Sequence, residues 1–104
     1  KLFATEVVEK KPDFPGGLTE FYNYVGKNFK VPEGKGLSGR IIVSFVVEKD
    51  GSITDIKVIK DIGYGTGNEA IRILQASPKW IPGEQFGKKV RVAYRLPLNI
   101  RANK

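Results

Sequence analysis

The sequence contains no histidine and no cysteine, and these two absences exclude several kinds of catalytic and metal-binding site. Without histidine there is no imidazole base for a nucleophilic triad. Without cysteine there is neither a disulfide framework nor a thiolate metal site, and a zinc site would lack its two commonest ligand types. We therefore predict that the chain is not an enzyme and that it holds no metal and no cofactor.

Long apolar runs are missing as well. No stretch approaches the roughly 18 apolar residues that a membrane-spanning helix needs, and no signal-peptide pattern opens the chain. The chain begins at Lys1 and contains no methionine. We therefore expect a fragment or a processed product whose membrane anchor and linker are absent, and a length of 104 residues predicts a single domain over 1–104.

Acidic residues are missing from the C-terminal end. The net charge is +7, and no acidic residue follows Glu84. The basic residues beyond that point are Lys88, Lys89, Arg91, Arg95, Arg101 and Lys104. Such a local positive field favours an acidic partner, although lysines also protect exposed sheet edges from aggregation.

The first part of the chain predicts one strand and one helix. Residues 2–9 are expected to form a short peripheral strand, followed by a loop that Pro12 and Pro15 interrupt. A helix is expected from Gly17, which serves as its N-cap. The residues that recur at helical spacing are Leu18, Phe21, Tyr22, Val25 and Phe29.

A hairpin follows. Residues 40–48 are β-branched and apolar on both faces, which is typical of a central strand. Asp50 and Gly51 predict a two-residue turn in which both residues have positive φ. Residues 53–60 form the returning strand.

A second helix and a last strand complete the pattern. The helix is expected over 68–77, with Ala70, Ile71 and Leu74 buried and Ile73 as a further candidate, and Pro78 ends it. Residues 89–100 alternate strictly, which predicts a strand with one buried face. The order β-α-β-β-α-β then predicts an α+β domain of two layers, in which two helices cover one face of an antiparallel sheet.

Three local motifs have both a functional and a structural interpretation, and in each case we favour the structural one. Asp50–Asp55 resembles a calcium loop but lacks its alternating ligands and closing glutamate, which favours a turn. Gly63–Gly67 stands where a phosphate cradle would lie but lacks its spacing, which favours a linker. Trp80 has the residue type of a binding anchor, yet we expect it in the core.

The last strand has the marks of a sheet edge, where unpaired backbone groups can accept an extended peptide. Pro97 has no N–H, so it should face away from the central strand. Alternate residues of a strand point their N–H and C=O groups to the same side. The residues that alternate with Pro97, and that would offer these groups to the peptide, are Arg91, Ala93 and Arg95. The candidate peptide-binding residues are Lys89, Val90, Arg91, Val92, Ala93, Tyr94, Arg95, Leu96 and Pro97.

Two other kinds of partner were weighed for this strand. A basic strand with an aromatic residue is typical of single-stranded nucleic acid binding, but the alternation buries Tyr94 and leaves only Arg91 and Arg95 outside. We therefore expect no nucleic acid. An open edge also favours pairing with a second copy of the chain, which predicts a weak homodimer at high concentration.

Four phrases in fixed order resemble one known family. They are Phe14-Pro15-Gly16-Gly17, the stretch 39–59, Pro78-Lys79-Trp80-Ile81-Pro82-Gly83 and the stretch 87–97. Together they are similar to the C-terminal domain of TonB proteins, of the kind found in Bacteroidetes-type bacteria. The ending Leu98-Asn99-Ile100 departs from the family, where an aromatic residue often closes the strand.

This resemblance implies a periplasmic domain of an inner-membrane-anchored protein. It would bind the N-terminal box of an outer-membrane transporter by strand addition beside the last strand. It would also transmit force from the proton-motive complex of the inner membrane through the missing N-terminal part. The alternative is a TonB-like peptide-binding module of a membrane sensor or an antirepressor-type peptidase.

Overall fold

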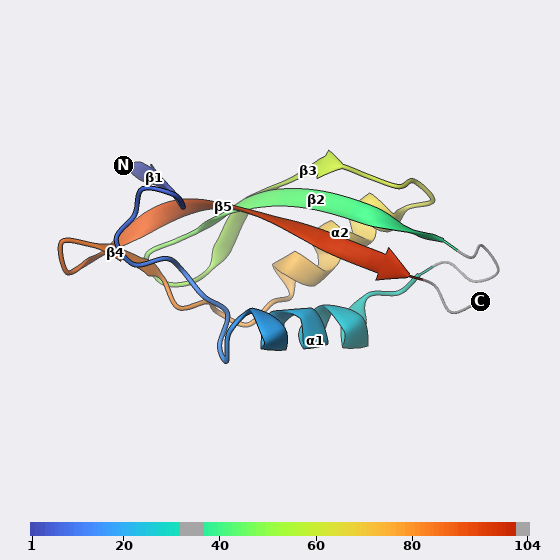
Figure 1. The fold of residues 1–104 in the computed structure, drawn as a ribbon, viewed down its shortest axis with the longest axis horizontal. Coiled ribbons are helices and arrows are strands. Elements are labelled where there is room, and N and C mark those ends of the chain that lie inside the picture. The colour runs from blue at the N-terminus through green and yellow to red at the C-terminus, as the bar shows by residue number, and fades with distance from the viewer. Residues whose placement is uncertain (32–36, 102–104) are drawn as a thin grey trace.

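The computed structural model of the protein describes residues 1–31 and 37–101 and confirms the predicted order of elements, with one short strand added. Figure 1 shows the arrangement. The elements are β1 (Leu2–Ala4), α1 (Leu18–Asn28), β2 (Ser38–Val47), β3 (Ile53–Lys60), α2 (Thr66–Gln75), β4 (Gly83–Gln85) and β5 (Lys88–Arg101). No helix in these described ranges has the length and apolar character that crossing a bilayer requires.

The sheet has the order β1-β5-β2-β3, and both helices pack against the same face of it (Figure 1). β2 pairs antiparallel with β3 and with β5, and β4 forms a short hairpin with β5. β1 runs parallel to β5. The predicted two-layer α+β fold is thus confirmed, with one correction. The sheet is mixed rather than antiparallel throughout, because the N-terminal segment joins it in parallel.

The core lies between the sheet and the helices. On β2 and β5 the alternating apolar residues meet in register, as in the pair Phe45 and Tyr94, whose rings stack 5.7 Å apart. Trp80 is 2% exposed, and its ring also contacts Phe14 and Phe21. The prediction that Trp80 belongs to the core is confirmed.

The turn between β2 and β3 differs from the predicted one. Only Gly51 has positive φ, at 88°, and the N–H of Glu48 donates to the carbonyl oxygen of Ser52 across a longer loop. The carboxylate of Asp50 instead accepts a hydrogen bond from the N–H of Ser52. A Cβ at position 51 would lie 2.1 Å from the carbonyl oxygen of Trp80, so the hairpin can pack against that residue only with glycine. These hydrogen bonds of Ser52 are those of a turn, the structural interpretation favoured for this segment.

Both predicted helices are present. Gly17 is the N-cap of α1, as predicted, and of the residues at helical spacing Phe21 and Val25 are buried, whereas Leu18 and Tyr22 are each 38% exposed. α2 begins at Thr66, two residues before the predicted start, and Ile73 is fully buried, whereas Ile71 is only partly buried.

The loop before α2 does not form a phosphate cradle. The carboxylate of Asp61 accepts hydrogen bonds from the N–H of Gly63 and the hydroxyl of Thr66. A Cβ on Gly67 would come within 2.2 Å of this carboxylate. The Asp61 carboxylate thus lies at the start of the helix, in the place that a bound phosphate would take. The interpretation of Gly63–Gly67 as a connecting segment is consistent with this arrangement.

Candidate functional site at the outer edge of β5

The backbone of β5 turns alternate residues toward β2 and away from it. Its pairing with β2 runs without a register shift from Arg101 to Val92. Pro97 lies opposite Ile42 and has no N–H, so this pair cannot exchange hydrogen bonds. Residues of the same parity, namely Arg95 and Asn99, must then direct their N–H and C=O groups away from β2.

Two side-chain contacts agree with this parity. The carbonyl oxygen of Pro97 accepts a hydrogen bond from the hydroxyl of Tyr22, at 3.0 Å. The carbonyl oxygen of Ala93 accepts one from the hydroxyl of Thr5. Both donors belong to segments other than β2, so both carbonyls point outward. Burial raises the pKa of Tyr22 above its ordinary value, so its hydroxyl stays a donor at neutral pH.

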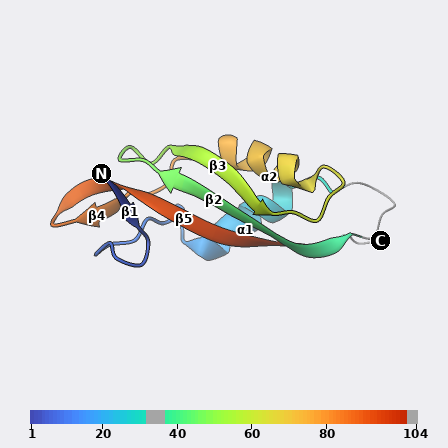
Figure 2. The ribbon, with the colours of Figure 1, turned by 90° about the horizontal axis from the view of Figure 1, so that it is seen from above.

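One half of this edge is already covered. β1 pairs with β5 from Arg91 to Ala93, and β4 pairs with β5 from Lys88 to Val90. Figure 2 shows β1 beside only the beginning of β5. The expectation of an edge that is open along its middle is therefore corrected. The chain's own N-terminal segment, β1 together with Thr5, covers the outer edge at Arg91 and Ala93.

The other half, from Tyr94 to Arg101, has no strand beside it within the part of the chain that the structure describes. Two hollows lie along it. The first, of about 470 Å³, begins where β1 ends and is lined by residues of β5 around Arg95 and by Lys11. The second, of about 350 Å³, lies between α1 and the end of β5. Tyr22 contacts the edge between them, at Pro97.

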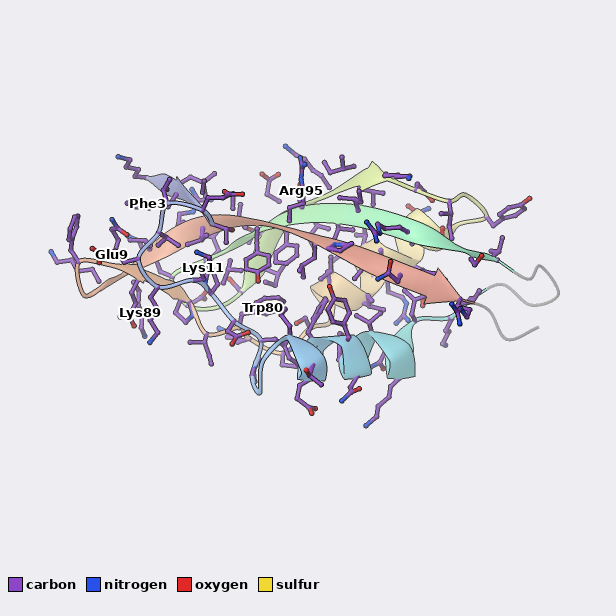
Figure 3. All side chains as sticks on the ribbon, viewed as in Figure 1. Phe3, Glu9, Lys11, Trp80, Lys89 and Arg95 are labelled. Atoms are coloured by element: carbon purple, nitrogen blue, oxygen red, sulfur yellow. The ribbon has the colours of Figure 1, made fainter. Side chains whose placement is uncertain are left out.

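The arginine side chains on the two halves of the edge also differ in their surroundings. Arg91 is bound by Glu48, with the Nε–Oε1 distance at 2.7 Å. This hydrogen bond, together with one from Thr54, holds the pKa of Glu48 below its ordinary value. Arg95 is exposed, and Figure 3 shows it projecting from the sheet on the side away from α1, whereas Trp80 lies between the sheet and α1. The arginine on the covered half is therefore held by a carboxylate, whereas Arg95 on the uncovered half is exposed.

The structure divides the nine predicted binding residues. Lys89 and Val90 lie beside β4, and Arg91 through Ala93 lie beside β1. Val92 and Leu96 are buried in the core, and Tyr94 is half-buried against the ring of Phe45. The predicted residues whose backbone groups face the open edge are thus Arg95 and Pro97.

The sequence reasoning missed the residues that extend this edge. The backbone groups of Asn99 and Arg101 point outward like those of Arg95, and the hollow beside them is also lined by Tyr22 and Val25 of α1 and by Phe29, which follows the helix. Helical spacing did place these three on one stripe. It could not show that the stripe reaches past the core to the sheet edge, because that depends on where α1 lies against β5.

Comparison with known proteins identifies the family. Residues 33–101, which are more than half of the chain, match the family described as Gram-negative bacterial TonB protein C-terminal. The chain belongs to this family, which confirms the resemblance seen in the sequence.

Relatives and solved structures agree. Protein TonB of Helicobacter pylori strain J99 is 39% identical over 72 residues, which are 64% of this chain and 25% of that protein. The protein of the same name from strain 26695 matches equally well. The chain thus spans only about a quarter of the curated relatives that it matches.

Solved structures of the Helicobacter pylori TonB C-terminal domain share the fold. The solution structure of its residues 194–285 has a TM-score of 0.65 at 22% identity and covers 84% of this chain and 95% of that one. The structure of its residues 179–285 has a TM-score of 0.56 at 26% identity, with 84% and 81% covered.

Proposed function

We propose that this domain binds an extended peptide as an added strand along the outer edge of β5, from Arg95 to Arg101. The observation that carries the proposal is the uncovered half of this edge, with outward backbone groups and a hollow at each end. Strand addition uses main-chain hydrogen bonds for affinity and side-chain pockets for specificity, and this edge offers both.

Membership of the family supports one kind of partner, the N-terminal segment of an outer-membrane TonB-dependent transporter. In this proposal the domain lies in the periplasm and catalyses nothing. It holds the transporter segment while the rest of the protein, anchored in the inner membrane, passes on force from a proton-motive complex. The exposed Arg95 and the basic C-terminal end favour a segment with an acidic residue on the outer face of the new strand.

The binding step follows from the edge geometry. The N–H and C=O groups of Arg95 and of Asn99 would each bond to the peptide, whereas Pro97 can only accept. The carbonyl oxygen of Pro97 has two lone pairs, so a peptide N–H would bond to it beside the Tyr22 hydroxyl. Binding would therefore leave both Tyr22 and β1 where they are.

Amide hydrogen exchange tests the proposal. In the free domain the amides of Arg95 and Asn99 should exchange fast, because neither bonds to β2, and those of Leu96 and Leu98 should be protected. Adding a nine-residue peptide from the N-terminal segment of a TonB-dependent transporter should protect Arg95 and Asn99. Protection gained on α2 or β3 instead, with no change at these two amides, would place the peptide elsewhere and refute strand addition at this edge.

A further inference from the structure

We propose that the hollow between α1 and the end of β5 is the side-chain subsite that selects the peptide. It would take an apolar side chain from the residue of the added strand that lies opposite Ile100. This inference rests on the proposed function, since it needs a strand beside β5, but it predicts something that strand addition alone does not.

Sheet geometry directs a side chain into this hollow. Residues directly opposite one another on neighbouring strands point to the same face of the sheet. Ile100 points to the helical face, where it is 6% exposed. The peptide residue opposite Ile100 must therefore point toward α1, where the hollow lies.

The lining of the hollow fits an apolar group. The walls are the apolar side chains of Val25, Phe29, Val31 and Ile100 with the ring of Tyr22. A leucine or phenylalanine would lose water-exposed surface here, whereas a lysine would have to bury its charge among apolar side chains without a partner.

Gly26 gives independent support. It lies in the last turn of α1, lines the hollow and lacks positive φ, so its backbone does not require glycine. A Cβ built there meets no atom within 4 Å, so crowding does not require glycine either. Glycine inside a helix is nevertheless less stable than alanine. What the missing side chain provides is the open space of the hollow itself.

A peptide series tests the subsite. The probes are nine-residue peptides from a TonB-dependent transporter's N-terminal segment in which each position in turn carries leucine, alanine or lysine. At one position leucine should bind about tenfold more tightly than alanine, as expected for burying the larger side chain, and lysine more weakly than alanine. The two neighbouring positions, which point to the other face, should show no such preference.

A variant of the protein locates the preference. Gly26→Leu fills the hollow from α1 and should remove the difference between the leucine and alanine peptides. The matched control is Lys27→Leu, which adds the same side chain to the same helical turn on an exposed position outside the lining. It should keep the full preference for leucine.

The outcomes separate this inference from the proposed function. If wild-type protein binds the leucine and alanine peptides equally at every position, the subsite is wrong but strand addition stands. If no peptide of the series binds, the proposed function fails and the subsite fails with it. Equal weakening of both peptides by Gly26→Leu also refutes the subsite. If that variant does not fold, the peptide series on wild-type protein still decides.

Discussion

The two halves of the outer edge of β5 have the same alternating pattern but different neighbours. From Arg91 to Ala93 the edge is paired with β1, and its arginine is bound by Glu48. From Arg95 to Arg101 the edge is unpaired among the described residues, and two hollows lie beside it. A strand's sequence therefore predicts which of its backbone groups point outward, but the segment that covers them comes from elsewhere in the chain.

The largest expected difference is between two proline variants on neighbouring residues of β5. Leu96 bonds inward to β2, so Leu96→Pro should lower the free energy of unfolding by about 3 kcal/mol or more. Arg95 faces outward, so Arg95→Pro should change it by less than about 1 kcal/mol, as for prolines on sheet edges. Urea unfolding followed by circular dichroism measures both.

The same pair separates folding from binding. Arg95→Pro removes an outward N–H and should lose peptide affinity while it stays folded, and Arg95→Ala serves as the control for the lost side chain. Unchanged affinity in a folded Arg95→Pro protein would show that the peptide does not pair with this half. The equivalent pair on the covered half, Val92→Pro and Ala93→Pro, should break the sheet in the first case and release β1 in the second.

A smaller effect of opposite sign is expected at the hollow. Gly26→Ala should raise the free energy of unfolding by about 0.5–1 kcal/mol, because alanine has the better helix propensity and its Cβ meets nothing. Thermal or urea unfolding shows whether this holds. A loss of stability would mean that the last turn of α1 needs glycine for its own folding, and the argument from open space would fail.

A pH effect is expected on the covered half. The pKa of Glu48 is lowered in the folded protein from its ordinary value of 4.5, chiefly by its hydrogen bond from Arg91. Its contribution to stability is therefore complete above about pH 4.5 and is lost as the pH falls through the lowered pKa. The difference in unfolding free energy between wild type and Glu48→Gln should be constant near neutral pH and should shrink in acid. A difference that grows in acid would contradict this assignment.

No change is expected when β1 is fixed in place. Ala4 and Ala93 are direct partners in the parallel pair, so cysteines at both positions can form a disulfide, and the chain has no other cysteine. If the peptide uses only the uncovered half, oxidised and reduced Ala4→Cys/Ala93→Cys protein should bind it equally. Loss of binding on oxidation would show that the peptide displaces β1 and reaches the residues first predicted from the sequence.

Much of the fold could be predicted from local pattern. The strict alternation of β5, the doubly apolar β2 and the helical stripe around Phe21 predicted these elements within about two residues. The parallel pairing of β1 could not be predicted, because three residues carry too little pattern and their partner is almost ninety positions away. The turn at Gly51 was also missed, since its shape depends on packing against Trp80.

The candidate site was only partly predictable. Pro97 predicted correctly which backbone groups turn outward, because a missing N–H is a property of one residue. Which of these groups are free depends on contacts that long-range packing creates, such as those of Thr5 with Ala93 and of Tyr22 with Pro97. Gly26 is an example of what the sequence does not reveal. In the sequence it is only a residue of low helix propensity, and its place beside the hollow depends on how α1 packs against β5.

The direction of β5 has a mechanical consequence. The domain measures 49 × 24 × 19 Å, and β5 runs along its longest dimension (Figure 2). A tether held beside β5 and pulled along the strand would be loaded in shear, so that its hydrogen bonds resist together rather than opening one after another. The strength of such a grip rises with the number of bonded rungs. Pro97 lacks the N–H that would donate in the middle of that series, and so would limit the tension at which such a tether slips.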